Sequence, residues 1–152
     1  MVGFSKLWQS YPDLKAPCRT NGSPHFPNQC AIRMGVCFEA AGVNTSKLNV
    51  TRCWYHPRED GHILRAEEFA KALSSGAVPG LGKVEKYKGT EAFPKIQKRT
   101  GIIFIENFYG SGSQGDHTDL WNGGRTTAFV RSLVNIWIGK YQKGNVWFWR
   151  VL

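Results

Sequence analysis

The chain has 152 residues, of which 41% are hydrophobic and 20% charged, which is the composition of one ordinary globular domain and not of a disordered chain. The formal net charge of +9 favours an anionic partner such as nucleic acid, an anionic cell-surface polymer or an acidic protein. No apolar run reaches the roughly 18 residues of a membrane span. The first residues lack the basic and then apolar pattern of a signal peptide.

The basic residues are scattered along the chain and form no long block. The richest stretch, 83–88, alternates lysine with other residues and predicts a solvated surface. A nucleic-acid-binding protein would place basic residues among exposed aromatic residues in a recognisable module, and the sequence contains none. We therefore expect no nucleic-acid partner, and only the charge and the 13% aromatic content speak for one.

The N-terminal part predicts a short helix, a long loop and then a central helix. Phe4, Leu7 and Trp8 have helical spacing, and the prolines between positions 12 and 27 predict a loop up to residue 27. The next helix is predicted over 29–41, with Asn28 as its N-cap. Its buried face is marked by a 4-3-4 spacing of apolar residues: Cys30, Met34, Cys37 and Ala41.

The middle of the chain contains more loop than regular structure. Residues 43–62 carry turn-forming asparagine, proline and glycine, and a second helix is predicted over 65–74. Residues 77–92 are rich in glycine, proline and lysine, which predicts a surface loop. A short helical turn is expected over 93–98.

The C-terminal part is predicted to form a sheet. Apolar residues over 101–108 indicate a central strand, and the alternation over 116–121 indicates a second strand. Residues 127–137 have helical spacing, although 134–138 also fits a strand. An aromatic strand over 146–152 completes an α+β fold. We expect one domain spanning 1–152, with N-terminal helices packed on a small, mostly antiparallel sheet.

The four cysteines do not form the paired spacing of a zinc site. Cys53 and His56 make a lone C-x-x-H, which is a weak signal, so we expect no metal and no other cofactor. If Cys30 is a free nucleophile, one disulfide is possible among Cys18, Cys37 and Cys53, and the sequence does not decide which two of them would pair.

Cys30 is the candidate nucleophile because it lies in the first turn of a helix. A thiol attacks as a thiolate, and its pKa near about 8.5 is lowered by a helix N-terminus and by a nearby imidazolium. The free N–H groups of the same turn can stabilise an oxyanion. A buried cysteine is more often only a core residue, so Cys30 needs a partner base.

His117 is the candidate base among four histidines. It lies in a predicted strand, directly after a glycine-rich connection, whereas the other three lie in loops. Asp119 lies on the same face of that strand as His117 and Trp121. In an extended strand, side chains two residues apart stand about 7 Å from each other, so direct support of His117 by Asp119 is not comfortable.

Three segments together resemble the family 4 type VI secretion amidase effectors. They are Cys-Ala-Ile-Arg-Met-Gly at 30–35, Gly-Asp-His-Thr-Asp-Leu-Trp-Asn-Gly at 115–123 and Val-Trp-Phe-Trp-Arg-Val at 146–151. The resemblance covers most of the chain in order. It implies a papain-like, NlpC-type fold and a bacterial toxin that cleaves peptidoglycan stem peptides at the γ-D-glutamyl–meso-diaminopimelate bond.

The resemblance also implies roles for residues and partners. Cys30 would be the nucleophile of a cysteine amidase and His117 its base. In the family an aspartate some way after the histidine completes a triad, but here 126–128 reads Thr-Thr-Ala. Asp119, Asn122, a threonine hydroxyl or a backbone carbonyl are therefore the candidates for the third group.

For substrate binding we name Arg33, Tyr109 and Trp121, although core packing also suits Trp121. The expected partners are peptidoglycan, the type VI secretion machinery and a cognate immunity protein that blocks the cleft. The toxin would be made without a signal peptide, injected, and active in the periplasm of the target cell.

Three other functions remain open from the residues alone. A non-catalytic cell-wall or glycan-binding module with an aromatic groove fits the missing carboxylate. A thiol hydrolase with another acyl substrate, such as a transglutaminase or a deamidase, fits the Cys30–His117 pair. A nucleic-acid-binding protein fits the charge alone.

Overall fold

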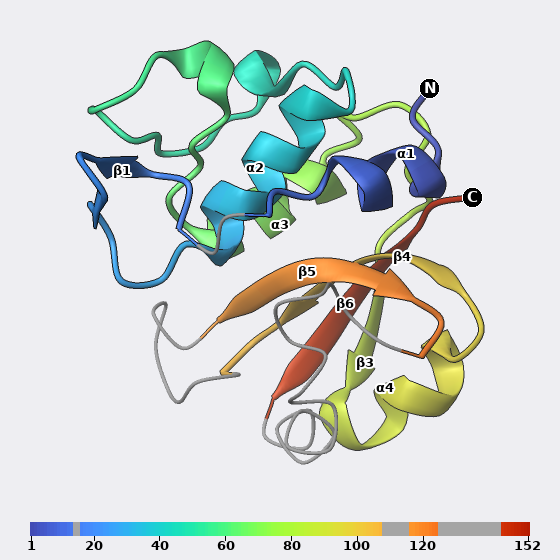
Figure 1. The fold of residues 1–152 in the computed structure, drawn as a ribbon. Coiled ribbons are helices and arrows are strands. Elements are labelled where there is room, and N and C mark those ends of the chain that lie inside the picture. Colours follow the sequence, from blue (N-terminus) through green and yellow to red (C-terminus); the bar gives the residue numbers. More distant parts are fainter. Residues whose placement is uncertain (14–15, 108–115, 125–143) are drawn as a thin grey trace.

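The structure is a computed structural model that describes residues 1–13, 16–107, 116–124 and 144–152. Helices occupy one side of an antiparallel sheet, and one helix covers the other side (Figure 1). The helical elements are α1 (Phe4–Ser10), α2 (Cys30–Ala40), η1 (Thr45–Lys47), η2 (Arg58–Asp60), α3 (Ala66–Ser74) and α4 (Gly89–Ile96). The strands are β1 (Arg19–Thr20), β2 (Ser23–Pro24), β3 (Glu85–Lys88), β4 (Thr100–Ile105), β5 (His117–Asn122) and β6 (Asn145–Arg150).

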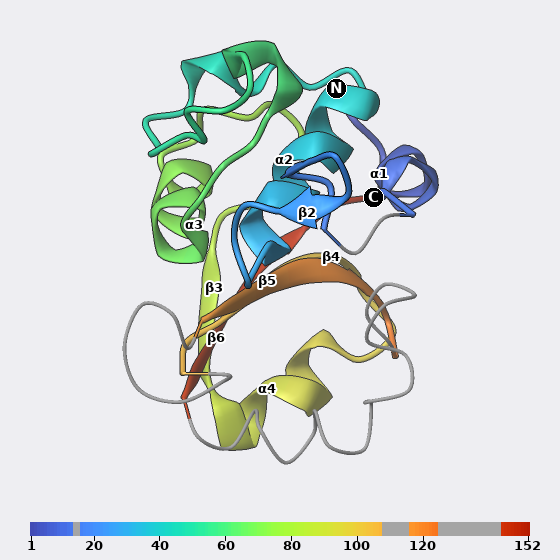
Figure 2. The ribbon, with the colours of Figure 1, turned by 60° about the vertical axis from the view of Figure 1, so that its left-hand side comes forward.

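The main sheet of the described residues has the strand order β3-β6-β4-β5, and every neighbouring pair is antiparallel. The register places Ile102 opposite Leu120 and Ile105 opposite His117. In Figure 2, α1, α2 and α3 lie above one face of this sheet, and α4 lies beneath the opposite face. The prediction of an α+β fold with a mostly antiparallel sheet is thus confirmed.

Both faces of the sheet are buried, and this explains the sequence of β4. Ile102 and Phe104 pack into the core beneath α1, α2 and α3, whereas Ile103 and Ile105 pack into a second core with α4. A strand that is buried on both faces reads as a continuous apolar run without polar alternation. The Ile-Ile-Phe-Ile run of β4 obeys this rule.

Helix α2 is central because nearly all of it is buried. Met34, Cys37 and Phe38 are fully buried against α1, α3 and the sheet. The helix begins one residue later than predicted, since Gln29 occupies the N-cap position. The Asn28 side chain nevertheless accepts a hydrogen bond from the Cys30 N–H at 3.2 Å, so it does satisfy a free donor of the first turn.

A close backbone approach fixes α2 against the loop after η2. A Cβ atom at Gly35 would lie 1.8 Å from the carbonyl oxygen of Gly61, and Gly61 itself has a φ of +73°. Glycine at 35 lets the two backbones touch, and glycine at 61 allows the left-handed conformation. The loop that carries residues 61 and 62 is therefore held directly on the helix of Cys30.

The expected surface loop over 77–92 is wrong in its second half. Residues 85–88 form β3, which pairs with β6, and α4 begins at Gly89 instead of residue 93. β3 is an edge strand with alternating charged residues, a composition that protects an edge from further pairing. The same composition is typical of a loop, which explains the error. The helix or strand expected over 127–137 and the connection over 109–115 lie outside the described residues.

None of the helices in the described ranges is long and apolar enough to cross a membrane. The two ends of the chain lie together, since the N–H of Phe4 donates to the carbonyl of Leu152 at 2.7 Å.

Candidate active site

Helix α2 places Cys30 at the wall of an open cavity of about 530 Å³. The cavity lies between the first turn of α2, the segment before α3 and the start of β5. Its lining includes Asn28, Cys30, Trp54, Arg65 and Asp116. Cys30 is only 3% exposed, so only a small part of this residue faces the cavity.

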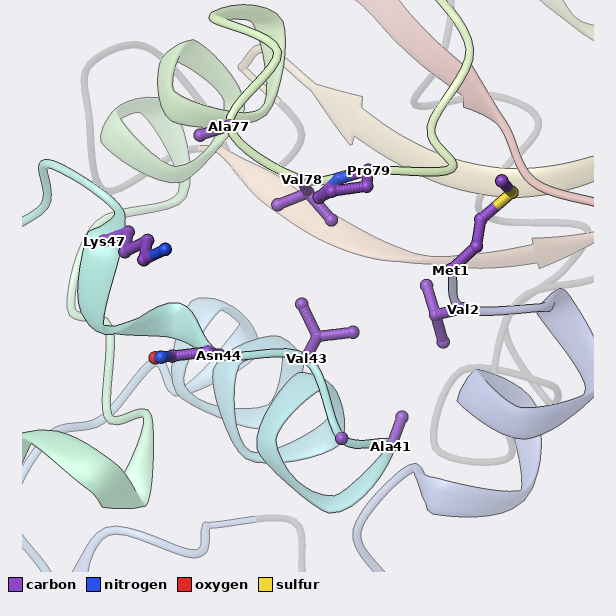
Figure 3. Close-up of a pocket in the computed structure, with 10 residues that line it drawn as sticks. Met1, Val2, Ala41, Val43, Asn44, Lys47, Ala77, Val78 and Pro79 are labelled. Carbon is purple, nitrogen blue, oxygen red and sulfur yellow. The ribbon is translucent and has the colours of Figure 1, made fainter.

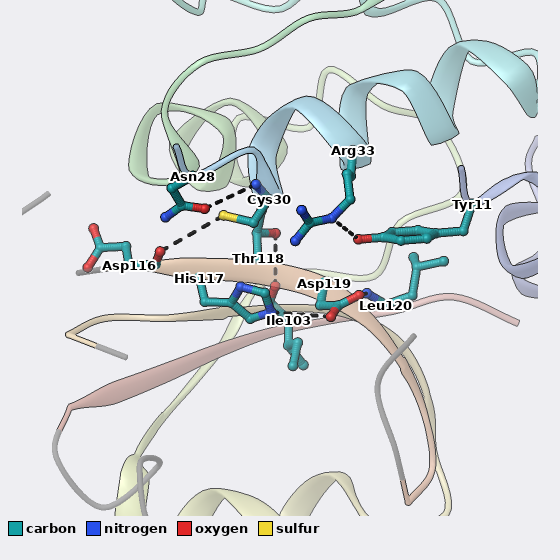
Figure 4. Close-up of polar contacts among 10 residues, drawn as sticks. All are labelled: Tyr11, Asn28, Cys30, Arg33, Ile103, Asp116, His117, Thr118, Asp119 and Leu120. Atoms are coloured by element: carbon teal, nitrogen blue, oxygen red, sulfur yellow. Dashed lines mark hydrogen bonds and ion pairs between the residues drawn. The ribbon is translucent and has the colours of Figure 1, made fainter. Parts of the chain in front are cut away.

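The environment of Cys30 favours the thiolate. Burial alone would raise its pKa, but a hydrogen bond and the positive charge of His117 outweigh burial and hold the pKa below its ordinary value. A backbone hydrogen bond from Thr118 and the charge of Arg33 act in the same direction. Helix α2, which carries Cys30, packs on β5, which carries His117, and the Cys30 Sγ lies 3.9 Å from the carbonyl oxygen of the preceding Asp116 (Figure 4).

His117 is the first residue of β5 and has no exposed surface. Burial would lower its pKa, but hydrogen bonds to Asp119 and to Cys30, together with their negative charges, raise it to about 9. Such an imidazole is protonated at neutral pH. The two groups thus favour a thiolate–imidazolium pair, which is the reactive form of a thiol nucleophile.

Asp119 is the carboxylate that contacts the base. Its Oδ2 lies 3.2 Å from Nε2 of His117, and its Oδ1 accepts the N–H of Leu120 at 2.8 Å. The 7 Å spacing of an ideal strand is too strict here, because the two side chains lean towards each other (Figure 4). The hydroxyl of Thr118, which lies between the two residues, donates to the carbonyl of Ile103 within the sheet. Residues 126–128 lie outside the described part of the chain.

Arg33 lies near the site but does not line the cavity. It is buried, and its Nε donates to the hydroxyl of Tyr11 at 3.0 Å. Its charge still acts on the Cys30 thiol and on Asp119. The arrangement gives Arg33 an electrostatic role beneath the site, and the expected direct contact with substrate has no support in the geometry.

Trp121 is a core residue, and its expected place in the cleft is wrong. It is 1% exposed, and its Nε1 donates to the carbonyl of Ile96 at 3.0 Å. Its ring meets Phe93 edge-on, on the α4 side of the sheet. Strand alternation correctly puts Trp121 on the same face as His117, but it does not say which layer covers that face, and at Trp121 the cover is the core on the α4 side. Tyr109, the third expected substrate-binding residue, lies outside the described residues.

Two exposed aromatic residues beside the cavity were missed from the sequence. Trp54 lines the cavity and is 70% exposed, and its ring meets Phe26 edge-on. The neighbouring Tyr55 is also exposed. A contiguous exposed apolar patch is often a binding site, whereas a single exposed aromatic side chain is not informative. The available signal is the Trp-Tyr pair itself, in a loop that is bounded by proline and glycine.

A second hollow of about 340 Å³ lies between the N-terminal residues, the end of α2 and the segment after α3 (Figure 3). Among the described residues, its lining contains no cysteine, histidine or carboxylate. It therefore offers no thiol, imidazole or carboxylate for catalysis.

Comparison with known proteins supports the fold and names a family. The family model described as type VI secretion system (T6SS), amidase effector protein 4, matches residues 26–149. No curated protein sequence matches the chain.

Two similar solved structures are effector–immunity complexes. The Tae4–Tai4 complex from Enterobacter cloacae has a TM-score of 0.64 at 15% identity, and the alignment covers 100% of this chain and 99% of the other. The Tae4/Tai4 system from Salmonella typhimurium, a selenomethionine variant, has a TM-score of 0.66 at 16% identity, with the same coverage. At these identities the likeness establishes the fold, and it agrees with the predicted fold class.

Proposed function

Because the chain belongs to the type VI secretion system amidase effector family 4, whose model matches residues 26–149, we propose that it cleaves peptidoglycan stem peptides as a cysteine amidase. Membership makes the chain an amidase effector. The observation that supports the cysteine mechanism is the buried chain of contacts from Cys30 through His117 to Asp119, at the wall of an open cavity.

The reaction begins with the thiolate of Cys30 attacking the carbonyl carbon of the scissile amide. The oxyanion that forms is stabilised by N–H groups of the first turn of α2, where the helix dipole is also favourable. Protonated His117 then donates its proton to the leaving nitrogen, the C–N bond breaks and a thioester remains on Cys30. Neutral His117 accepts a proton from water as the water attacks the thioester. Release of the carboxylic acid product restores the thiolate–imidazolium pair.

Asp119 holds the imidazole in place and stabilises its charged form. The carboxylate accepts from Nε2 of His117 and is itself fixed by the Leu120 N–H. A base that is oriented by a third group and stabilised when protonated is the general logic of such triads.

We propose the γ-D-glutamyl–meso-diaminopimelate bond as the target, on the family resemblance. A stem peptide carries carboxylate groups as well as an amine, and the cavity has charged residues that suit such a ligand. Arg65 supplies a guanidinium at the wall, and Asp116 also lines the cavity, with its carboxylate held by the N–H of Asn107 at 3.0 Å. Trp54 offers an apolar surface at the rim. The net charge of +9 also suits an anionic wall polymer.

We further propose that a cognate immunity protein covers this cavity. Both similar solved structures are complexes of an effector with its immunity protein. An acidic inhibitor would complement the basic surface and block access to Cys30. Delivery by the secretion machinery would bring the toxin to the periplasm of the target cell.

The test is digestion of purified sacculi, with separation of the released muropeptides. Digestion by wild type should leave a free γ-carboxyl on the glutamate that stays on the glycan and a free amine on the diaminopimelate fragment, and Cys30→Ala and His117→Ala should give neither product. Cys37→Ala is the matched control, because Cys37 is a buried cysteine on the same helix whose thiol donates to the Leu7 carbonyl. Undiminished digestion by Cys30→Ala would disprove the thiol mechanism.

A non-catalytic wall-binding module is the second candidate, and the exposed Trp54 and Tyr55 pair is the observation in its favour. In the same experiment it predicts that folded wild type sediments with sacculi and releases no products. Wild-type digestion that depends on Cys30 and His117 would exclude it.

A further inference from the structure

Four side chains with metal-binding atoms converge outside the Cys30 site. Cys18 comes from the segment before β1, and Cys53, His56 and His62 come from the loops around η2. One ligand atom from each residue lies within 4.8 Å of all the others. Three of the four side chains are buried, and His56 is half-buried.

The distances inside this cluster fit a tetrahedral centre. The sulfurs of Cys18 and Cys53 lie 3.3 Å apart, and Nδ1 of His56 lies 3.6 Å from the first and 3.5 Å from the second. Bonds of about 2.3 Å from zinc to sulfur and about 2.0 Å to nitrogen give edges of about 3.8 Å between sulfurs and about 3.5 Å between sulfur and nitrogen. The two sulfurs would need to separate by about half an ångström, and the nitrogen is already in place.

His62 supplies an independent observation. Within the part of the chain that the structure describes, its buried Nδ1 has no hydrogen-bond partner. Its ring centroid lies 4.2 Å from that of His56. A buried nitrogen without a partner is costly, and a metal ion would satisfy it.

A disulfide between Cys18 and Cys53 explains less of this arrangement. It would use two of the four groups and leave Nδ1 of His62 without a partner. A divalent cation would use all four groups, because it binds both thiolates with displacement of their protons and both imidazoles.

The backbone around the cluster is already organised. The N–H of Tyr55 donates to the sulfur of Cys53 at 3.3 Å, as is common around metal-bound thiolates, and the N–H of Cys53 donates to the carbonyl of His62 at 2.9 Å. The amide of Gln29 bonds the N–H and the carbonyl of Cys18 at 2.8 and 2.9 Å. The ligands are thus held by contacts that do not depend on a metal.

We propose that Cys18, Cys53, His56 and His62 bind one structural zinc ion. Two sulfur and two nitrogen ligands select zinc over hard cations such as magnesium or calcium. Four protein ligands close the coordination sphere and leave no position for a reactive water, so the site is structural. Two thiolates neutralise the ion, which lowers the cost of burying it.

The zinc ion would strengthen the fold beside the nucleophile. Cys18 and Cys53 share a small buried cluster with Ile32 of α2, separate from the main core. Such a small cluster buries little apolar surface, and a metal is a common way to stabilise it. Gln29, which bonds Cys18, directly precedes Cys30, so the site would fix the entry of the chain into the catalytic helix.

The test begins with wild type, expressed with zinc in the medium and purified with a non-thiol reductant. Elemental analysis should find about one zinc ion per chain. Replacement of zinc by Co²⁺ should give the visible bands of a tetrahedral centre and a thiolate-to-cobalt charge-transfer band in the near ultraviolet. Both measurements use the unmodified chain, so they do not depend on the folding of a variant.

Variants then locate the ligands. Cys18→Ser and His62→Ala should weaken zinc binding by more than about 100-fold, since loss of contacts behind the ligands alone costs up to about 100-fold. Cys37→Ser, a buried cysteine outside the cluster, should retain zinc, and inactive Cys30→Ala should retain it as well, which separates this test from that of the amidase. The proposal is overturned if wild type carries no zinc and gives no cobalt–thiolate band. It is also overturned if Cys18 and Cys53 form a disulfide in preference to binding offered zinc.

Discussion

Substitution of Asp119 by asparagine removes the charge next to His117 while keeping the shape of the side chain. Both residues are buried, and their contact is 3.2 Å long. A hydrogen bond to a charged group contributes about 1.5–3 kcal/mol, and one pKa unit corresponds to about 1.4 kcal/mol. We therefore expect the pKa of His117 to fall from about 9 by about one to two units.

The sign of the effect on activity depends on the proton that His117 must carry. The imidazolium exists below its pKa, so acylation by wild type declines as the pH rises through about 9. In Asp119→Asn that decline moves to lower pH, and the pKa of the Cys30 thiol rises because its cationic partner is less populated. The pH range of activity therefore narrows, because its upper limit, set by His117, falls and its lower limit, set by Cys30, rises. At pH 7 we expect kcat/KM to fall by about 10- to 150-fold, from the same 1.5–3 kcal/mol.

The assay is kcat/KM on a purified muropeptide as a function of pH, together with the rate of Cys30 alkylation by iodoacetamide, which reports the thiolate. Asp13→Asn is the matched control, because Asp13 is exposed. The unfolding midpoint of each variant is measured alongside. An activity loss that is equal at every pH, with both limbs unmoved, would refute the catalytic reasoning and leave Asp119 a merely structural role.

Three further predictions concern stability and substrate binding. Gly35→Ala should lower the free energy of unfolding by at least about 1–3 kcal/mol, because a methyl group would overlap a backbone carbonyl; thermal denaturation should show this, whereas Gly124→Ala, with open space around it, should be neutral. Trp54→Ala should raise KM for muropeptides with little change in kcat or in the unfolding midpoint, since the ring is exposed at the rim; an unchanged KM would contradict its contact with substrate. Glu85→Gln should cost up to about 1 kcal/mol at neutral pH, because the hydrogen bond from Arg99 lowers the pKa of Glu85; wild type should lose this advantage as the pH falls through that lowered pKa, so a difference that persists in acid would argue against the ion pair.

The elements that carry the chemistry can be predicted from the sequence because their signals are local. The apolar spacing over 29–41 predicts a buried helix without knowledge of its neighbours. The predicted start of that helix places Cys30 in its first turn. The apolar run of β4 similarly depends on burial alone. Pairing Cys30 with His117 needs the family resemblance, because 86 residues separate Cys30 from the segment that begins at Asp116.

The predictions that fail are those that depend on tertiary contacts, which the sequence pattern does not show. Asp119 reaches His117 because the two side chains lean towards each other, which the 7 Å spacing of an ideal strand does not anticipate. Strand alternation does not say which layer covers each face, so it cannot tell that Trp121 belongs to the core. The ligands of the proposed zinc site come from position 18 and from the segment over 53–62, so the sequence shows only the lone C-x-x-H of Cys53 and His56, and the expectation of no metal missed the other two. β3 resembles a loop in sequence because an edge strand is polar.

The contact between Gly35 and Gly61 has a consequence for the interpretation of mutational scans. In a survey of toxicity across all substitutions, position 35 should be as intolerant as the nucleophile itself, although glycine has no side chain with which to act. The two positions would separate only when protein abundance is scored beside toxicity. Cys30 variants should accumulate as intact protein without activity, whereas Gly35 variants should be lost from the cell. Intolerance at this glycine would thus record a distance between two backbones and not a step in the reaction.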